Sequence, residues 1–236
     1  MTYLDTGKIT PYLDTVNIEV EDGAMKREGE PQSRGDGYHH GDLRRALLDA
    51  ALALIEEKGL EALTLREVAR RVGVSHAAPY HHFADLGALV SALAVEGLQG
   101  LGATQRAAAA GASQGSAAAR VHALGLDYVR YAVRNPARFR LMWRPELCGS
   151  SDGEAVKAAG LEAYAPLLEA VAAGVGNGEF AADTVDGLAF AAWAEVHGIA
   201  TLLVDGPIGR QLSGPEAAVE LAGETVHRLL DGLLVR

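Results

Sequence analysis

The sequence predicts an all-α fold in which a three-helix helix-turn-helix head joins a larger helical body. Alanine and leucine dominate a chain of 236 residues that is 49% hydrophobic. No stretch alternates apolar and polar residues with the period of a strand, whereas several segments after residue 43 repeat apolar residues every three or four positions. This apolar content is enough for a sizeable core and excludes extensive disorder.

Residues 1–37 precede the first periodic segment and are expected to form a flexible arm, because they are rich in Gly, Asp, Glu and Thr. The tetrapeptide YLDT occurs twice in this arm, at residues 3–6 and 12–15. The repeat is either a chance event or a sign that residues 1–24 are translated from DNA upstream of the natural start. In the second case the native protein begins at Met25.

The head is expected over residues 38–100 and begins with an amphipathic helix. From Leu43, apolar residues recur at i, i+4, i+7, i+8, i+11 and i+12, and charged residues lie between them. Lys58 and Gly59 end this helix, because a cation suits the last turn and glycine readily adopts a positive φ.

Two short helices and a longer one follow. Thr64 is expected to cap the second helix, with Glu67 completing a capping box, and Gly73 ends it. Ser75 then caps a third helix that runs to about His82, and Asp85 begins a longer fourth helix. Helices as short as the second and third do not persist alone in water, so both must pack on the first. This packing leaves the far side of the third helix exposed.

The body is expected over residues 101–236, after a Gly/Ser/Ala connector that begins past residue 106. Proline and capping residues mark the ends or bends of several of its helices. The predicted helices cover residues 117–134, a segment opened by Asn135 and Pro136, residues 154–175 with a bend at Pro166, residues 183–204, and a last helix opened by a Ser213–Glu216 capping box.

Composition narrows the classes of protein and site. The single cysteine, Cys148, excludes an internal disulfide framework and suits the cytoplasm. The sequence has no apolar run of about 18 residues without charges, so no membrane span is predicted. It also lacks a basic segment followed by an apolar one at the N-terminus, so no secretory signal is predicted. The histidines at positions 76, 81 and 82 lack the i, i+4 spacing of a helical zinc pair, so neither a metal nor a cofactor is expected.

Two motifs carry a resemblance to a known family. The segment TLREVARRVGVS, followed by Y-x-H-F from Tyr80 to Phe83, resembles the DNA-binding head of TetR/AcrR-family transcriptional regulators. Trp193, His197 and Gly198 resemble the Trp-x-x-x-His-Gly signature of one TetR-like C-terminal domain. The resemblance implies a homodimeric repressor that binds a palindromic operator in double-stranded DNA and is released by an unidentified, mostly apolar small-molecule effector.

The third helix is expected to enter the major groove with its N-terminal residues towards the base edges. Those residues are Ser75, His76, Ala77 and Ala78, of which the alanines can contact a thymine methyl group. By resemblance, Tyr80 and His81 contact the DNA backbone, together with Thr64 and Arg66 from the second helix. Such contacts position the head without specifying sequence.

Three features of the head weaken the implied contacts. The net charge of the chain is −10, and residues 38–100 carry six Lys or Arg against eight Asp or Glu, so DNA binding must depend on geometry. Leu86 stands where the family usually has a phosphate-binding lysine. Pro79 replaces the usual aliphatic residue and removes a backbone donor from a helix of barely two turns.

Two sets of residues in the body are candidate sites, although each could instead be ordinary core. Aromatic and sulfur-containing side chains indicate an apolar ligand pocket lined by Tyr128, Tyr131, Phe139, Met142, Trp143, Tyr164, Trp193 and His197. The corresponding last two helices of the family form a dimer interface. The residues expected there are Leu188, Ala192, Val196, Leu203, Val226 and Leu230.

Two other functions stay open. One is a TetR-like scaffold that has lost DNA binding and acts through a ligand or protein partners, which Leu86, Pro79 and the acidic head favour. The other is an all-helical enzyme whose active site is assembled from distant residues. The sequence contains no G-x-S-x-G, H-E-x-x-H or Gly-rich phosphate loop, so we do not expect an enzyme.

Overall fold

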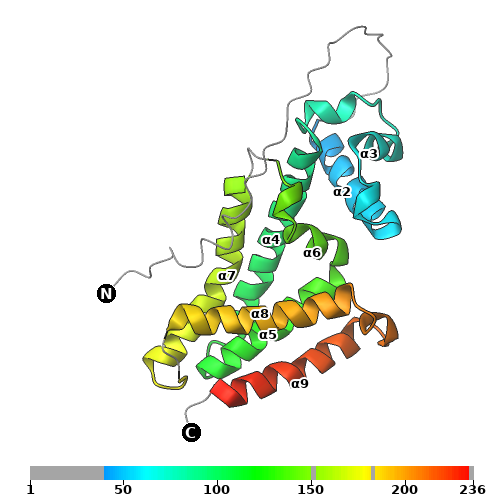
Figure 1. The fold of residues 1–236 in the computed structure, drawn as a ribbon. Helices are drawn as coiled ribbons and strands as arrows, with labels where there is room; N and C mark the ends of the chain where they lie inside the picture. The colour runs from blue at the N-terminus through cyan, green and yellow to red at the C-terminus, as the bar shows by residue number, and fades with distance from the viewer. Residues whose placement is uncertain (1–39, 150–152, 182–183, 234–236) are drawn as a thin grey trace.

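The computed structural model of the protein describes residues 40–149, 153–181 and 184–233, which form α-helices joined by short loops and 3-10 turns (Figure 1). The all-α prediction is confirmed. The predicted arm at residues 1–37, with the proposed start at Met25, lies outside the described residues.

The head contains α2 (His40–Lys58), the 3-10 turn η2 (Leu60–Ala62), α3 (Leu65–Val72), the 3-10 turn η3 (Ala78–His81) and the first part of α4 (Leu86–Gly111). Its core combines the predicted apolar face of α2 with residues from the start of α4. Leu47, Leu54, Val68, Leu89 and Leu93 are fully buried there. The head therefore has a hydrophobic core of its own.

The ends of these helices follow local chemistry. Gly59 and Gly73 adopt φ values of 82° and 80°, as expected for glycines that end helices. The Thr64 hydroxyl oxygen accepts the Glu67 backbone N–H at 3.1 Å, which confirms the predicted cap of α3. The reciprocal half of the capping box is not formed, because the Glu67 carboxylate instead accepts hydrogen bonds from Arg70 and Lys58.

The third helix of the head differs from the prediction. Only residues 78–81 are helical, and they form a 3-10 turn rather than an α-helix from Ser75 to His82. Ala78 N–H donates to the Ser75 carbonyl at 3.0 Å, and Tyr80 N–H donates to the Ala77 carbonyl at 3.2 Å. Pro79 has no N–H to complete an α-helical bond to Ser75, so the segment adopts the tighter i→i+3 pattern.

Helix α4 runs from the head deep into the body (Figure 1) and continues to Gly111, so the predicted connector shrinks to residues 112–116. The remaining elements are α5 (Ala117–Arg134), α6 (Pro136–Met142), η4 (Pro145–Leu147), α7 (Gly153–Gly176), α8 (Val185–Val204), η5 (Gly209–Gln211) and α9 (Pro215–Leu233). The predicted bounds of α5 and the start of α6 at Pro136 are confirmed.

Two contacts fix the ends of body helices in ways that the sequence did not predict. The Glu179 carboxylate, after α7, accepts the N–H groups of Ala117 and Ala118 at 2.9 and 2.8 Å. It therefore holds the α7–α8 connection against the start of α5. At α9, Gly214 takes the cap position and the Glu216 carboxylate pairs with Arg134, so the Ser213–Glu216 capping box is a wrong prediction.

The body has a separate hydrophobic core, and α6 contributes to both cores. Ala137 and Leu141 of α6 belong to the head core, whereas Phe139 and Met142 belong to the body core. Along α4 the change occurs between Leu93 and Leu98. A shift of α6 would therefore disturb the packing of both parts.

Three helices, α4, α7 and α8, are long and apolar enough to cross a membrane by length and composition alone. The sequence expectation considered only charge-free runs, so it did not identify them. In the fold, α4 packs along α7, and α8 packs against α5 and α7. Packing between helices therefore buries part of the apolar surface of all three, from half of the apolar window in α4 to a third in α8.

Candidate functional site

The segment from Ser75 to His81 forms a projecting surface of the head. Ser75, His76, Ala77 and His81 are exposed, Tyr80 is 59% exposed, and Ala78 is half-buried. Pro79 and Phe83 are buried on the inner side of the same segment. The predicted contact residues of this segment are thus accessible to a partner, apart from the half-buried Ala78.

The buried side of this segment explains how so short a turn is held. The Phe83 ring lies in the head core, and the Arg44 guanidinium carbon lies 5.4 Å from the ring centroid. The backbone N–H groups of His82 and Phe83 both donate to the Pro79 carbonyl at 2.9 Å. Pro79 and Phe83 therefore anchor the segment and leave the Tyr80 and His81 side chains directed outward.

Thr64 and Arg66 lie exposed at the N-terminus of α3. The Thr64 hydroxyl oxygen is used by the helix cap, but its hydrogen can still be donated to an anion. Free backbone N–H groups and the helix dipole also favour an anion at such a terminus. This geometry suits contact with a phosphate group.

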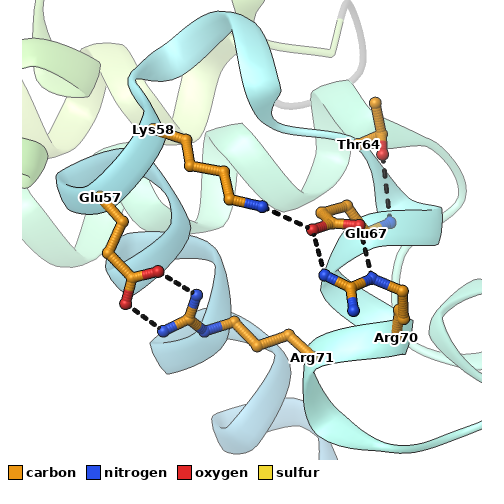
Figure 2. Close-up of polar contacts among 6 residues, drawn as sticks. All are labelled: Glu57, Lys58, Thr64, Glu67, Arg70 and Arg71. Atoms are coloured by element: carbon orange, nitrogen blue, oxygen red, sulfur yellow. Dashed lines mark hydrogen bonds and ion pairs between the residues drawn. The ribbon is translucent and has the colours of Figure 1, made fainter.

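Most cations on this side of the head are already paired with carboxylates (Figure 2). Glu67 accepts hydrogen bonds from Arg70 and Lys58, which lower the pKa of its carboxyl group to about 2. The Glu57 carboxylate forms an ion pair with a single cation among the described residues, the Arg71 guanidinium. Arg66, in contrast, makes no ion pair with any residue that the structure describes.

The interior of the body contains a cluster of rings, which we name the aromatic cluster. It comprises Tyr128 of α5, Phe139 of α6, Trp143 after α6, Tyr164 of α7, and Phe190, Trp193 and His197 of α8. Neighbouring ring centroids lie 5.1–6.3 Å apart, so the rings are in contact. The cluster joins four helices around His197 and Trp193.

Hydrogen bonding and burial define the polar character of this cluster. The Tyr128 hydroxyl and His197 Nδ1 lie 2.8 Å apart and form a hydrogen bond. Burial lowers the pKa of His197, which favours the neutral imidazole, and raises the pKa values of Tyr128 and Tyr164. The buried Trp143 Nε1 and Tyr164 hydroxyl have no hydrogen-bond partner among the described residues.

The structure brings together six of the eight residues predicted to line a ligand pocket. Met142 packs beside the cluster in the same core, but against Gly97 of α4. Tyr131 faces α4 as well, where its hydroxyl donates to the Gly97 carbonyl at 2.7 Å. Phe190 was missed, although it lies one helical turn before Trp193 and the i, i+3 spacing could have identified it.

The residues predicted for a dimer interface are placed differently from the expectation. Leu188, Ala192, Val196, Leu203 and Val226 are buried in the body core, so their side chains have no surface to offer a partner. Leu230 lies outside the residues whose side chains are described. The apolar periodicity of α8 marks the face that packs on α5 and α7.

The opposite face of α8 is exposed and has small or apolar side chains. Ala191, Ala194, Gly198 and Thr201 recur along it, and Leu202 beside them is 53% exposed. Nothing lies within 4 Å of the position that a Cβ of Gly198 would occupy. This face allows another helix to approach closely.

No group of three His, Cys, Asp or Glu side chains within the described part of the chain could hold a metal ion. Cys148 is half-buried, and its thiol faces the Arg144 carbonyl at 3.8 Å. The described residues thus offer two features that could bind a partner: an exposed polar segment on the head and an aromatic cluster in the interior of the body.

Comparison with known proteins gives two family matches. Residues 47–93 match the family model described as bacterial regulatory proteins, tetR family. Residues 121–226 match the model of the tetracyclin repressor-like C-terminal domain. The tetracycline repressor protein class D of Escherichia coli is 42% identical over 53 residues, which are 22% of this chain. That match spans about a quarter of the length of the curated relative.

Solved structures extend the similarity over most of the chain. A protein of unknown function from Rhodococcus sp. RHA1 is 32% identical, with a TM-score of 0.68, over 85% of this chain and 100% of that one. A ketosteroid transcriptional regulator of Mycobacterium tuberculosis has a TM-score of 0.62 at 20% identity, over 82% of this chain and 96% of that one. The second likeness concerns the fold alone.

Proposed function

Because this chain belongs to the TetR family of bacterial regulatory proteins, we propose that it is a DNA-binding transcriptional repressor. In this proposal a homodimer in the cytoplasm binds a palindromic operator in double-stranded DNA. A small, mostly apolar effector enters the body and releases the operator. The family assignment favours this reading over an all-helical enzyme.

The observation that carries the proposal is the exposed segment from Ser75 to His81 on its buried anchors, Pro79 and Phe83. A segment that recognises DNA must expose its polar and small side chains, while its buried residues fix its orientation on the head. His76 can reach a base or phosphate, and the small side chains of Ser75 and Ala77 let the backbone approach base edges. Thr64 and Arg66 would then contact phosphates on one side.

One such head would read only half of a palindrome, so the proposal requires two copies. The exposed face of α8, with Ala191, Ala194 and Gly198, supports a second copy there, since small side chains allow close helix packing. Helix α9 adds Leu221, a large hydrophobic residue that is also exposed. A two-fold dimer would place its recognition segments about 34 Å apart, one turn of DNA.

The aromatic cluster supports the effector part of the proposal. Its rings come from α5, α6, α7 and α8, and α6 also packs in the head core through Ala137 and Leu141. A ligand that displaces a ring from the cluster would move α6 and therefore the head. Coupling of this kind is typically worth about 1–3 kcal/mol.

The chemistry of the cluster indicates an uncharged ligand. Burial lowers the pKa of His197 and so favours its neutral form, and a buried charge without a partner is costly. The unpartnered Trp143 Nε1 is a donor, so it favours a ligand that brings a hydrogen-bond acceptor. An aromatic or alicyclic molecule with one or two acceptor oxygens fits these conditions.

A second candidate is a TetR-like scaffold that no longer binds DNA. The ion pairs of Lys58, Arg70 and Arg71 favour it, because they leave few free cations on the head. The two candidates differ in salt-dependent binding to duplex DNA, which only the repressor should show.

The test replaces Tyr80 and His81 together by alanine. Both side chains are exposed, so the fold and the dimer should survive, whereas the mobility shift of an operator fragment should be lost. The matched control replaces Ser113 and Gln114, exposed residues in the connector between α4 and α5, and should bind like wild type. Unchanged binding by the Tyr80/His81 variant, with the dimer intact in sedimentation, would exclude this surface as the DNA contact.

A further inference from the structure

We propose that Glu67 limits the affinity of the head for DNA phosphates by holding Arg70 and Lys58 in ion pairs. The inference rests on the proposed DNA-binding function. Arg70 Nε and Nη2 donate to the two Glu67 carboxylate oxygens at 2.8 and 2.6 Å, and Lys58 Nζ donates to Oε1 at 3.1 Å (Figure 2). One carboxylate therefore occupies two cations from two helices.

The cations of this triad lie on the surface while the acid lies beneath them. The side chains of Arg70 and Lys58 are 66% and 51% exposed, whereas that of Glu67 is 25% exposed. Arg70 follows Arg66 by four residues, so the two arginines share one side of α3, with Arg66 in the first turn after the Thr64 cap and Arg70 in the last turn. The Arg70 guanidinium turns back along the helix to reach Glu67, so once released it would lie about one helical turn from a phosphate bound beside Arg66.

Both bonds of Arg70 to Glu67 have the bidentate geometry that guanidinium also offers to phosphate. A phosphate must therefore displace the carboxylate before Arg70 can bind it. Exposed ion pairs are worth only about 0–1 kcal/mol, so this exchange is possible but lowers the net gain. If Glu67 were absent, the side chains of Arg70 and Lys58 could bind a phosphate without first breaking these ion pairs.

The ion pairs of Glu67 lower the affinity of the head for DNA without changing which DNA sequence it prefers. Phosphate contacts are equal on all sequences, whereas the residues from Ser75 to His81 face the base edges. Holding two cations back reduces binding to random DNA, so a larger share of the binding free energy depends on the recognition segment. The acidic balance of the head then lowers the affinity for DNA of any sequence and leaves sequence choice to the recognition segment.

The experiment compares Glu67→Gln with wild type on a random-sequence duplex, using fluorescence anisotropy at salt concentrations from 50 to 200 mM. Thr64 still caps α3 in the variant, because the cap uses the Glu67 backbone N–H. Each added phosphate contact steepens the slope of log K against log salt by about 0.9. We expect Glu67→Gln to steepen it by about one to two.

The matched control is Glu61→Gln, which removes the same charge from the neighbouring turn η2. Glu61 is exposed and makes no ion pair with a described residue, so its slope should stay close to wild type. Replacing Arg70 by Gln in the Glu67→Gln background should reverse most of the change. The same replacement in the wild-type background should alter the slope less.

Equal effects of Glu67→Gln and Glu61→Gln, or no effect of either, would overturn the role of Glu67. Should Glu67→Gln unfold, Glu67→Ala retains the Thr64 cap and must give the same steeper slope. If wild type binds no duplex at any salt concentration, the proposed function itself fails. Binding by wild type with an unchanged slope in the variant contradicts this inference alone.

Discussion

Gly174, near the end of α7, lies where the body core has no room for a side chain. A Cβ at this position would overlap Cδ2 and Cε2 of the Phe180 ring and lie 2.9 Å from the Ala117 Cβ. Carbon atoms in normal contact are about 3.5–4.0 Å apart. Gly174→Ala therefore requires the ring or the helix to move.

The ring cannot move freely, because the backbone fixes it above Gly174. The N–H groups of Glu179 and Phe180 both donate to the Gly174 carbonyl, at 2.8 and 3.0 Å, and Phe180 is buried in the body core. Overpacking of a core typically costs about 1–3 kcal/mol. We expect Gly174→Ala to lower the free energy of unfolding by that amount.

Gly160 is the matched control, because it lies in the same helix and nothing lies within 4 Å of its Cβ position. Alanine there should raise the free energy of unfolding by about 0.5–1 kcal/mol, since glycine is a poor helix former. Urea unfolding at one fixed protein concentration measures both, and Trp143 and Trp193 report on the body because both belong to the aromatic cluster. A Gly174→Ala protein as stable as the Gly160→Ala protein would refute the reasoning.

Two further predictions concern the body. Hydrogen bonds from the first N–H groups of α5 lower the pKa of Glu179, so its stabilising effect is present at neutral pH and is lost as pH falls through the lowered pKa. Glu179→Gln should therefore lower the free energy of unfolding by a few tenths to about 1 kcal/mol at pH 7. In denaturant unfolding, the difference between this variant and wild type should shrink as the pH falls. A difference that grows in acid would contradict this. N-phenyl-1-naphthylamine, an uncharged aromatic probe, should quench the tryptophans, and Tyr128→Phe should change its affinity more than Tyr131→Phe, because only Tyr128 is bonded to His197. Equal affinities of the two variants in a fluorescence titration would remove Tyr128 from the ligand site.

Features that depend on neighbours in the sequence could be predicted. The cap of α3 by Thr64 and its end at Gly73 need only a hydroxyl three residues before an N–H group and a residue that adopts a positive φ. The start of α6 at Pro136 is similar, because proline fits the first turn of a helix. Local chemistry determines these ends whatever the tertiary packing.

Features that depend on tertiary packing could not be predicted. Tyr128 and Tyr131 lie three residues apart on α5, yet one bonds to α8 and the other to α4. The apolar pattern of α8 identified a buried face, but periodicity does not say whether the chain itself or a second copy covers it. The pairing of Lys58 with Glu67 likewise joins two helices whose crossing sets the distance.

The most direct measurement of the central claim is selection of DNA fragments by the purified protein, followed by footprinting of the enriched sequence. We predict an inverted repeat with two protected major-groove segments on one face of the duplex, their centres about 34 Å apart. The protection should disappear when Tyr80 and His81 are replaced by alanine. Failure to enrich any sequence, or protection that persists in that variant, would contradict the account.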